Sequence, residues 1–451
     1  MPAPSTSDAG LRDGQPSVLQ RTLAAVKTWV VCHAFFTLMF MTSGLILNVF
    51  QLLVYLLVRP FSRHLYRRIN YYLIYTSWSQ VVALAQWWSG SRLRVWGTDE
   101  DLEALLADHH LCVMNHSYEV DWLACWMVTD QFGVLANAKT FAKKSLQWVP
   151  IIGWNWALSE HIFLERSWEK DSQTIGGKLD LLLDYKDKIL LLLFSEGTRF
   201  NEKKHKLSLE FASKRNLPKL KHHLLPRPKG FVYCAQHLKQ RGVPAIFDVQ
   251  LGFRDSPNPP KIMTILNGHP FVGDIYFRRV PLNQVPTDTE EECTQFLYDL
   301  YVHKDKVMED YLETGRFPGT VRELPVRVWP AVNMTAWGIL TGAPCLYAFY
   351  AILTSGSTFT VVAFSTFIAL CECSFPSFLV CIINVAQSLL LEGVCAGFCW
   401  PQAKAEEFIF NPFSAVFFPS CTWNANLVLH RKVVACFTKY SCNEKGVARV
   451  T

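Results

Sequence analysis

The stretch LCVMNHSYEVDWLACWMV, residues 111–128, decides the fold because its hydrophobic pattern changes halfway along. Residues 111–114 form an apolar run that fits a short buried strand, whereas residues 120–128 carry apolar side chains at helical spacing. Two more apolar runs, 188–194 and 245–251, have the length of buried strands. Strands that alternate with helical segments are typical of an α/β layered domain. In open α/β sheets the functional site lies at the carboxyl ends of the strands, so the residues after each run are candidates for a site.

The first run leads into NHSYEVD, residues 115–121, which places His116 five positions before Asp121. On one continuous helix these side chains would point about 140° apart, so they can meet only if His116 ends the strand and Asp121 begins the helix. A carboxylate that accepts a hydrogen bond from one imidazole nitrogen leaves the other nitrogen free as a general base. The alternative is an ordinary polar turn at a helix N-terminus.

The second run leads into FSEGTRF, residues 194–200, which joins a glycine to an arginine. The backbone N–H groups of a glycine turn and a planar guanidinium both match the oxygens of a phosphate. This pattern predicts a phosphate-binding turn. The alternative is an ordinary glycine turn beside a surface arginine.

Together, NHxxxxD and FxEGTR resemble the glycerolipid acyltransferase superfamily. Further stretches resemble the 1-acylglycerol-3-phosphate O-acyltransferases of the gamma and delta kind. They are FGVL (132–135), KKSLQWVPIIGW (143–154), IFLERSWEKD (162–171), HLLPRPKGF (223–231) and RGVPAIFDV (241–249). The resemblance covers about residues 20–330.

This resemblance implies a role for each motif. His116 deprotonates the sn-2 hydroxyl of a lysophospholipid, Asp121 orients and stabilises the imidazolium, and the oxygen attacks an acyl-CoA thioester. Acyl-CoA is a co-substrate, and no cofactor is implied. The residues that match substrate-binding blocks of the family are Glu196, Gly197, Thr198, Arg199, Arg166, Lys229, Val243 and Pro244. Arg166 stands in HIFLER, which lacks the glycine that usually begins this block.

Other polar residues have a plainer alternative. Lys143 and Lys144 could contact CoA phosphates or anionic headgroups, or form a solvated basic edge at the membrane. The histidine pairs 109–110 and 222–223 have no cysteine or carboxylate at metal-ligand spacing, so we expect no metal site. Most of the 14 cysteines lie at or beyond Cys345 in apolar runs, where cysteine behaves as a small hydrophobe.

Composition indicates a membrane protein. Half of the 451 residues are hydrophobic and 18% are charged, which excludes a disordered chain. A net charge of +6 without a Lys/Arg run argues against a nucleic-acid partner. Residues 29–58 carry no acidic or basic side chain except His33, and a helix of that length exceeds the roughly 30 Å hydrocarbon core. Residues 69–91 are uncharged but aromatic and partly polar, which fits an interfacial or re-entrant helix as well as a full span. Residues 328–371 and 373–391 are uncharged, and two or three more spans fit there, at roughly 331–354 and 359–399.

These patterns predict five regions along the chain. They are a flexible tail (1–28), N-terminal membrane-anchoring helices (29–91), an α/β acyltransferase domain with a mixed sheet flanked by helices (92–327), a C-terminal transmembrane region (328–400) and a divergent tail of open role (401–451). The arginines at 59, 63, 67 and 68 favour a cytosolic loop after the first span, which places the catalytic domain beside cytosolic acyl-CoA. A cytosolic domain is also required because a glycan on the sequon at Asn115 would block the base. The family implies a multi-pass protein of the endoplasmic reticulum membrane.

Three functions remain open at this point. The leading one is transfer of a fatty acyl group from acyl-CoA to lysophosphatidic acid, which gives phosphatidic acid. The second is acylation of another lysophospholipid, such as lysophosphatidylinositol or lysocardiolipin. The third is a membrane scaffold that binds lipid without turnover, against which the intact His116, Asp121 and Arg199 argue.

Overall fold

The structure is a computed structural model that describes residues 17–362, except 106, 166, 255, 257–259, 355–356 and 359–361. Arg166, the predicted spans beyond residue 362 and the tail at 401–451 lie outside the described residues. The segment expected to be a flexible tail contains helix α1 (Val18–Lys27) near its end.

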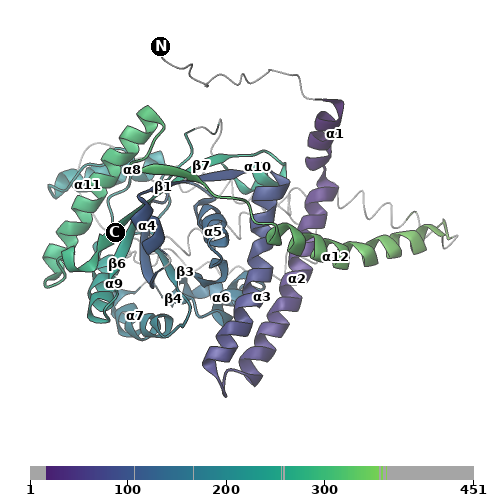
Figure 1. Cartoon of the computed structure of the whole chain (residues 1–451), viewed down its shortest axis with the longest axis horizontal. Coiled ribbons are helices and arrows are strands. Elements are labelled where there is room, and N and C mark those ends of the chain that lie inside the picture. The colour runs from purple at the N-terminus through teal and green to yellow at the C-terminus, as the bar shows by residue number, and fades with distance from the viewer. Residues whose placement is uncertain are drawn as a thin grey trace, which may run out of the picture. The chain divides into compact units, whose positions relative to one another are not determined.

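One mixed sheet organises the chain (Figure 1), with eight strands in the order β4-β3-β5-β2-β6-β7-β1-β8. The first five strands in this order are mutually parallel. Strand β7 is antiparallel to β6, β1 is parallel to β7, and β8 is antiparallel to β1. The strands are β1 (Arg92–Gly97), β2 (His110–Met114), β3 (Ala138–Lys143), β4 (Ile162–Leu164), β5 (Leu190–Leu193), β6 (Ala245–Gly252), β7 (Val272–Pro281) and β8 (Thr320–Glu323). The predicted fold class is therefore confirmed, and the three predicted strands are the neighbours β5, β2 and β6.

Strand β2 shows how the sheet separates two cores. Its residues alternate in direction: Cys112 and Met114 join one hydrophobic cluster, and Leu111 and Val113 join the other. The first cluster includes residues of α3 (Arg63–Ala83), α5 (Asp121–Gln131), α6 (Ile152–Leu158) and α10 (Ile262–Leu266). The second includes residues of α7 (Trp168–Leu183), α9 (Pro228–Gln240) and α11 (Glu290–Thr314). The remaining helices before residue 329 are α2 (Val30–Leu57), α4 (Asp99–Ala104) and α8 (Glu202–Lys214).

The hairpin of α2 and α3 packs along the domain, as Figure 1 shows. Helix α2 buries polar residues on the inner side, where Gln51 accepts from Asn48 at 3.0 Å and donates to Asn70 of α3 at 2.9 Å. Its outer side is apolar and exposed, with Leu45, Val49 and Leu53 among its residues. Helix α3 buries ten residues against its neighbours, which favours the interpretation in which the second uncharged segment does not cross the bilayer.

Arg67 attaches this hairpin to the catalytic domain. Its side chain is 4% exposed, and it donates to Glu160 Oε2 at 2.8 Å and to Asp184 Oδ2 at 2.9 Å. A third hydrogen bond, of 2.8 Å, reaches the carbonyl of Leu181. Removing one partner of a buried charge pair costs about 3–5 kcal/mol, so this contact holds α3 firmly on the domain.

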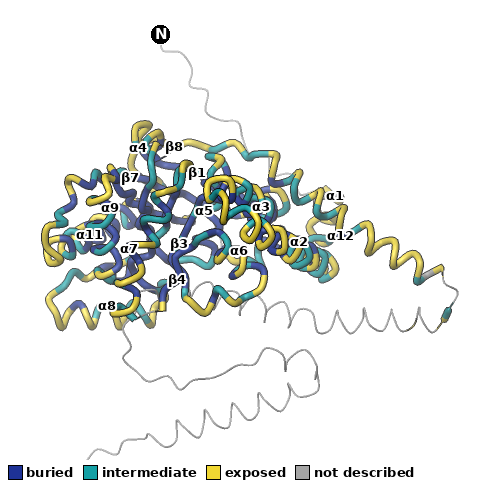
Figure 2. Tube along the Cα trace, turned by 90° about the horizontal axis from the view of Figure 1, so that it is seen from below, coloured by how far each residue is buried: buried dark blue, intermediate teal, exposed yellow. Residues whose placement is uncertain are grey.

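Helix α12 (Trp329–Thr354) is the second long apolar helix of the described residues. By length and composition, Val30–Leu57 and Trp329–Ile352 are the described helices that could cross a membrane. Much of α12 is exposed along its length (Figure 2), including Leu340, Leu346 and Tyr350.

Candidate active site

The carboxyl ends of β2 and β6 are tied together by Asn115, the first residue after β2. Its Oδ1 accepts from the backbone N–H of Leu251 at 2.8 Å, and its Nδ2 donates to the Leu251 carbonyl at 3.0 Å. Asn115 is fully buried. Because both ends of its amide are bonded, this residue fixes the point at which the chain leaves the strand.

His116 and Asp121 meet directly after this point. The chain turns between strand and helix, which brings His116 Nδ1 to 2.8 Å from Asp121 Oδ2. The same oxygen accepts the backbone N–H groups of Ser117 at 2.9 Å and Tyr118 at 3.0 Å. Burial raises the pKa of the Asp121 carboxyl, although these hydrogen bonds oppose the rise. The carboxylate thus holds the imidazole from one side, with Nδ1 as the donor.

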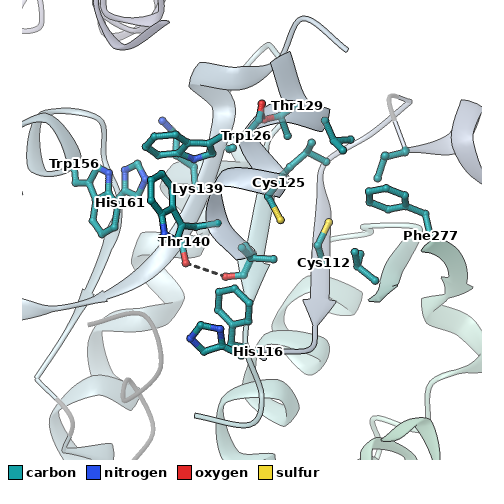
Figure 3. A pocket seen from close by; sticks show the side chains of 18 residues that line it. Cys112, His116, Cys125, Trp126, Thr129, Lys139, Thr140, Trp156, His161 and Phe277 are labelled. Carbon is teal, nitrogen blue, oxygen red and sulfur yellow. Dashed lines mark hydrogen bonds between the residues drawn. The ribbon is translucent and has the colours of Figure 1, made fainter. Parts of the chain in front are cut away.

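The other imidazole nitrogen is left open. His116 Nε2 is buried and has no hydrogen-bond partner among the described residues. The ring packs against Phe194 with the centroids 4.3 Å apart, and it lines a cavity of about 70 Å³. Figure 3 shows His116 at one end of the group of side chains that surround this cavity. A buried imidazole nitrogen without a partner, on a residue that lines a cavity, is placed where a general base can act.

The cavity wall is almost entirely apolar. It is formed by strands of the sheet and by helices of the first hydrophobic cluster. Helix α5 contributes Trp122, Cys125, Trp126 and Thr129, which lie at helical spacing, and β2 contributes Cys112. The sequence contains this stripe, but without the structure it is the ordinary inward side of a core helix. The remaining lining residues are Leu105, Val128, Ala138, Lys139, Thr140, Trp156, His161, Leu190, Leu192, Phe194, Val249 and Phe277.

Two titratable residues in this wall were not predicted, Lys139 and His161. Burial lowers the pKa of Lys139 to about 7 and holds the pKa of His161 well below its usual value. Lys139 Nζ donates to the carbonyl of Ala136 at 3.0 Å. His161 stacks on Trp156 with a centroid separation of 5.1 Å. At neutral pH the cavity therefore has a polar but weakly charged end.

The turn after β5 lies against His116. Phe200 N–H donates to the His116 carbonyl at 2.7 Å, which brings the neighbouring Arg199 close to the base. Gly197 has φ of 69°, a left-handed conformation that glycine adopts without strain. Lys204 donates to the hydroxyl of Thr198 and, at 3.2 Å, to the carbonyl of Arg199. The partly exposed Arg199 guanidinium has no protein partner within the described part of the chain, so it is free to bind an anion.

Glu196 is buried, and both of its carboxyl oxygens accept hydrogen bonds from the backbone. It is 1% exposed, and its two oxygens accept from the backbone N–H groups of His116 at 3.0 Å and Leu224 at 3.2 Å. Burial raises the pKa of this carboxyl to about 8, against the two N–H groups that lower it. The geometry makes Glu196 a residue that positions His116, a role the motif does not reveal.

Val243 and Pro244 lie away from His116. They precede β6, which runs parallel to β2, so they lie at the edge of the sheet opposite to His116. The eight residues from Pro244 to Leu251 span about 23 Å of strand. Val243 is buried in the second cluster, and this distance separates both residues from His116. The resemblance identified a real motif but could not say which edge it occupies.

The other predicted residues lie away from His116 or in surface contacts. Lys229 is exposed in the first turn of α9, with Nζ 5.9 Å from the centre of the Trp168 ring. Lys144 forms an ion pair with Glu165. His109 accepts the Ile189 N–H at 3.2 Å, and His110 contacts the Ala104 carbonyl at 2.8 Å.

Comparison with known proteins agrees with this geometry. Residues 98–248 match the family model described as Acyltransferase, and residues 264–337 match the model described as Acyltransferase C-terminus. Both matches are to acyltransferase models, and His116 and Asp121 lie within the first of them.

The human 1-acyl-sn-glycerol-3-phosphate acyltransferase delta is 40% identical over 339 residues, which are 75% of this chain and 89% of the relative. The mouse protein named gamma is 39% identical over 346 residues, which are 77% of this chain and 91% of the relative. The chain belongs to this acyltransferase family and is similar to its gamma and delta members.

Proposed function

We propose that this protein transfers a fatty acyl group from acyl-CoA to the sn-2 hydroxyl of lysophosphatidic acid, giving phosphatidic acid and CoA. The observation that carries the proposal is the unpartnered His116 Nε2 at the end of an apolar cavity. An apolar wall suits a hydrocarbon chain, because polar groups in it would lose water without gaining a partner. No cofactor is needed, since acyl-CoA brings the activated acyl group.

The reaction follows from the open nitrogen. His116 Nε2 takes the proton of the lysolipid hydroxyl while its oxygen forms a bond to the thioester carbonyl carbon. The carbon–sulfur bond then breaks, CoA leaves as the thiolate, and the imidazolium returns a proton to it. Asp121 Oδ2 stabilises the imidazolium through the 2.8 Å hydrogen bond to Nδ1. General-base catalysis of this kind contributes about 10²–10⁴ in rate.

Arg199 supports lysophosphatidic acid as the acceptor. A terminal phosphomonoester is a compact dianion, and a guanidinium can hold it with two parallel hydrogen bonds. The names of the gamma and delta relatives, acyltransferases of 1-acyl-sn-glycerol-3-phosphate, point to the same acceptor. Another lysophospholipid, such as lysophosphatidylinositol or lysocardiolipin, is the alternative acceptor, and a lipid-binding scaffold is the alternative without turnover.

A panel of lysophospholipids with one labelled acyl-CoA tests the acceptor. We expect purified protein to acylate lysophosphatidic acid in preference to the phosphodiester lysolipids in direct competition. Preference for a phosphodiester would overturn the acceptor and leave acyl transfer standing. No transfer to any lysolipid would support the scaffold.

Arg199→Lys tests the phosphate contact, because it keeps the charge but loses the planar fork. We expect a higher KM for the lysolipid with little change in the KM for acyl-CoA. Arg215→Lys is the matched control, since Arg215 is exposed at the end of α8 and lies over the Phe211 ring. A raised KM for acyl-CoA alone would place Arg199 on the other substrate.

We further propose that the protein resides in the endoplasmic reticulum membrane with its catalytic domain in the cytosol. The exposed apolar sides of α2 and α12 support membrane attachment. A cysteine introduced at the exposed Lys203 should react with an impermeant reagent added to the cytosolic side. Protection until the membrane is permeabilised would contradict this orientation. Since Asn115 is fully buried, a glycan at that position would also contradict the folded site.

A further inference from the structure

A second buried carboxylate, Asp305 of α11, is bonded in the same way as Asp121 but lies outside the cavity. Its Oδ1 accepts from His222 N–H at 2.7 Å and contacts His223 Nδ1 at 3.0 Å. Its Oδ2 accepts from Lys221 N–H at 2.7 Å. One side chain thereby fixes three consecutive residues of the loop before α9.

That loop continues directly into the contact that holds the catalytic histidine. The next residue, Leu224, donates its N–H to Glu196 Oε2 at 3.2 Å, and Glu196 Oε1 accepts the His116 N–H at 3.0 Å. A continuous series of hydrogen bonds therefore leads from Asp305 through the loop and Glu196 to the backbone of His116. All three loop bonds to Asp305 and both bonds to Glu196 lie within buried or half-buried surroundings.

Asp305 itself is held in place by the residue before it. Lys304 is fully buried, donates from Nζ to the Val249 carbonyl at 2.6 Å and pairs with Asp248 of β6. Gln250 Nε2 donates back to the Lys304 carbonyl at 2.8 Å. Because β6 is also bonded to Asn115, the helix and the base are fixed to the same strand.

We infer that Asp305 is a positioning residue for acyl transfer, which acts on His116 through residues 221–224 and Glu196. This inference rests on the proposed function, since it assigns a role in that reaction. It gives α11, within the segment that matches the Acyltransferase C-terminus model, a direct connection to the base.

A double-mutant cycle tests this inference with Asp305→Asn and Glu196→Gln. An amide at position 305 places an NH₂ group against a backbone donor, which releases the loop. We expect Asp305→Asn to lower kcat about tenfold with little change in either KM, since small displacements of a catalytic group are costly in rate. If Asp305 acts through Glu196, the double variant should be no slower than Glu196→Gln alone.

Glu309→Gln is the matched control. Glu309 lies one turn beyond Asp305 on α11 and pairs with Lys221, so it joins the same helix and loop at the exposed surface. We expect wild-type kcat from this variant. Asp305→Glu, which keeps both acceptor oxygens on a longer side chain, provides a milder second variant if Asp305→Asn does not accumulate.

The outcomes distinguish this inference from the proposed function. Equal kcat in Asp305→Asn and the wild type, or losses that multiply in the double variant, would overturn the positioning role. The wild type would still transfer acyl groups in either case. Loss of the proposed function would instead appear as a wild type without acyl transfer.

Discussion

The two buried His–Asp pairs, His116–Asp121 and His223–Asp305, are built almost alike. In each, a carboxylate contacts an imidazole Nδ1, at 2.8 Å and 3.0 Å, and accepts two backbone N–H groups. Of these two histidines only His116 lines the cavity, whereas His223, whose Nε2 also has no hydrogen-bond partner among the described residues, packs edge-on to Tyr301. A buried His–Asp pair alone therefore does not make a general base. The histidine must also line a cavity that a substrate can enter.

The carboxyl groups of the two pairs also differ in the direction of their pKa shifts. Burial raises the pKa of Asp121 above its usual value. Burial acts the same way on Asp305, but the His223 ring and the N–H groups of Lys221 and His222 outweigh it and hold that pKa below its usual value. Ionisation of Asp121 therefore costs the folded protein stability, whereas ionisation of Asp305 stabilises it.

The largest contrast is expected from replacing each carboxylate by an amide. Asp121→Asn should lower kcat about 10²–10⁴-fold, because it removes the charge that stabilises the imidazolium. Asp121 Oδ1 has no partner among the described residues, so the amide NH₂ can take its place and the melting temperature should not fall.

Asp305→Asn should show the reverse order of effects. It should lower stability by about 1–3 kcal/mol, because a buried backbone donor loses its acceptor, while kcat falls only about tenfold. Thermal unfolding and acyl transfer measured on the same preparations check both variants. Equal losses of stability in the two would contradict the contrast.

The pH dependence of stability should have opposite sign at the two sites. A depressed carboxyl pKa contributes stability above about pH 3.9 that is lost as pH falls through the folded value, so the deficit of Asp305→Asn should shrink toward pH 3. A raised pKa removes stability as pH rises from about 3.9 through the folded value. Asp121→Asn should therefore gain on the wild type between pH 3 and pH 7 in thermal unfolding. The same slope for both variants would be inconsistent with these two pKa shifts.

The smallest effect is expected at a third, more exposed pair, His237–Asp180. Its atoms are 2.8 Å apart, but the side chains are 16% and 38% exposed, and Arg241 also contacts Asp180. Surface ion pairs contribute about 0–1 kcal/mol, so Asp180→Asn should leave stability within that range and kcat unchanged. A loss of activity here would show that the sheet edge near Val243 and Pro244 takes part in the reaction after all.

The sequence predicts those contacts of the candidate site that join residues close together in the chain. His116 and Asp121 are five residues apart, and the switch from an apolar run to helical spacing places them at a strand exit. The turn at Gly197 follows from the same kind of evidence. These features can be predicted because they depend on residues that are close in the sequence. The strand, the turn and the first helical residue determine each other's positions without the rest of the chain.

The contacts between residues that are far apart in the chain could not be predicted from the sequence. Asp305 lies 82 residues from His223, and nothing in its helical segment distinguishes it from a surface carboxylate. Glu196 matches a substrate-binding block of the family, but only its contacts with distant segments of the folded protein show that it faces inward. The distance of Val243 and Pro244 from His116 could not be foreseen either, because a motif match does not specify the direction of its strand.

The most direct test of the account is acyl transfer by His116→Ala beside His223→Ala, in membranes that contain equal amounts of protein. Both variants lose a buried imidazole that contacts a carboxylate and has an unpartnered Nε2 among the described residues, but only the first loses an imidazole that lines the cavity. The account predicts a loss of about 10²–10⁴ in rate for His116→Ala and a loss within about tenfold for His223→Ala. Near-normal turnover by His116→Ala, or equal losses in the two variants, would contradict it.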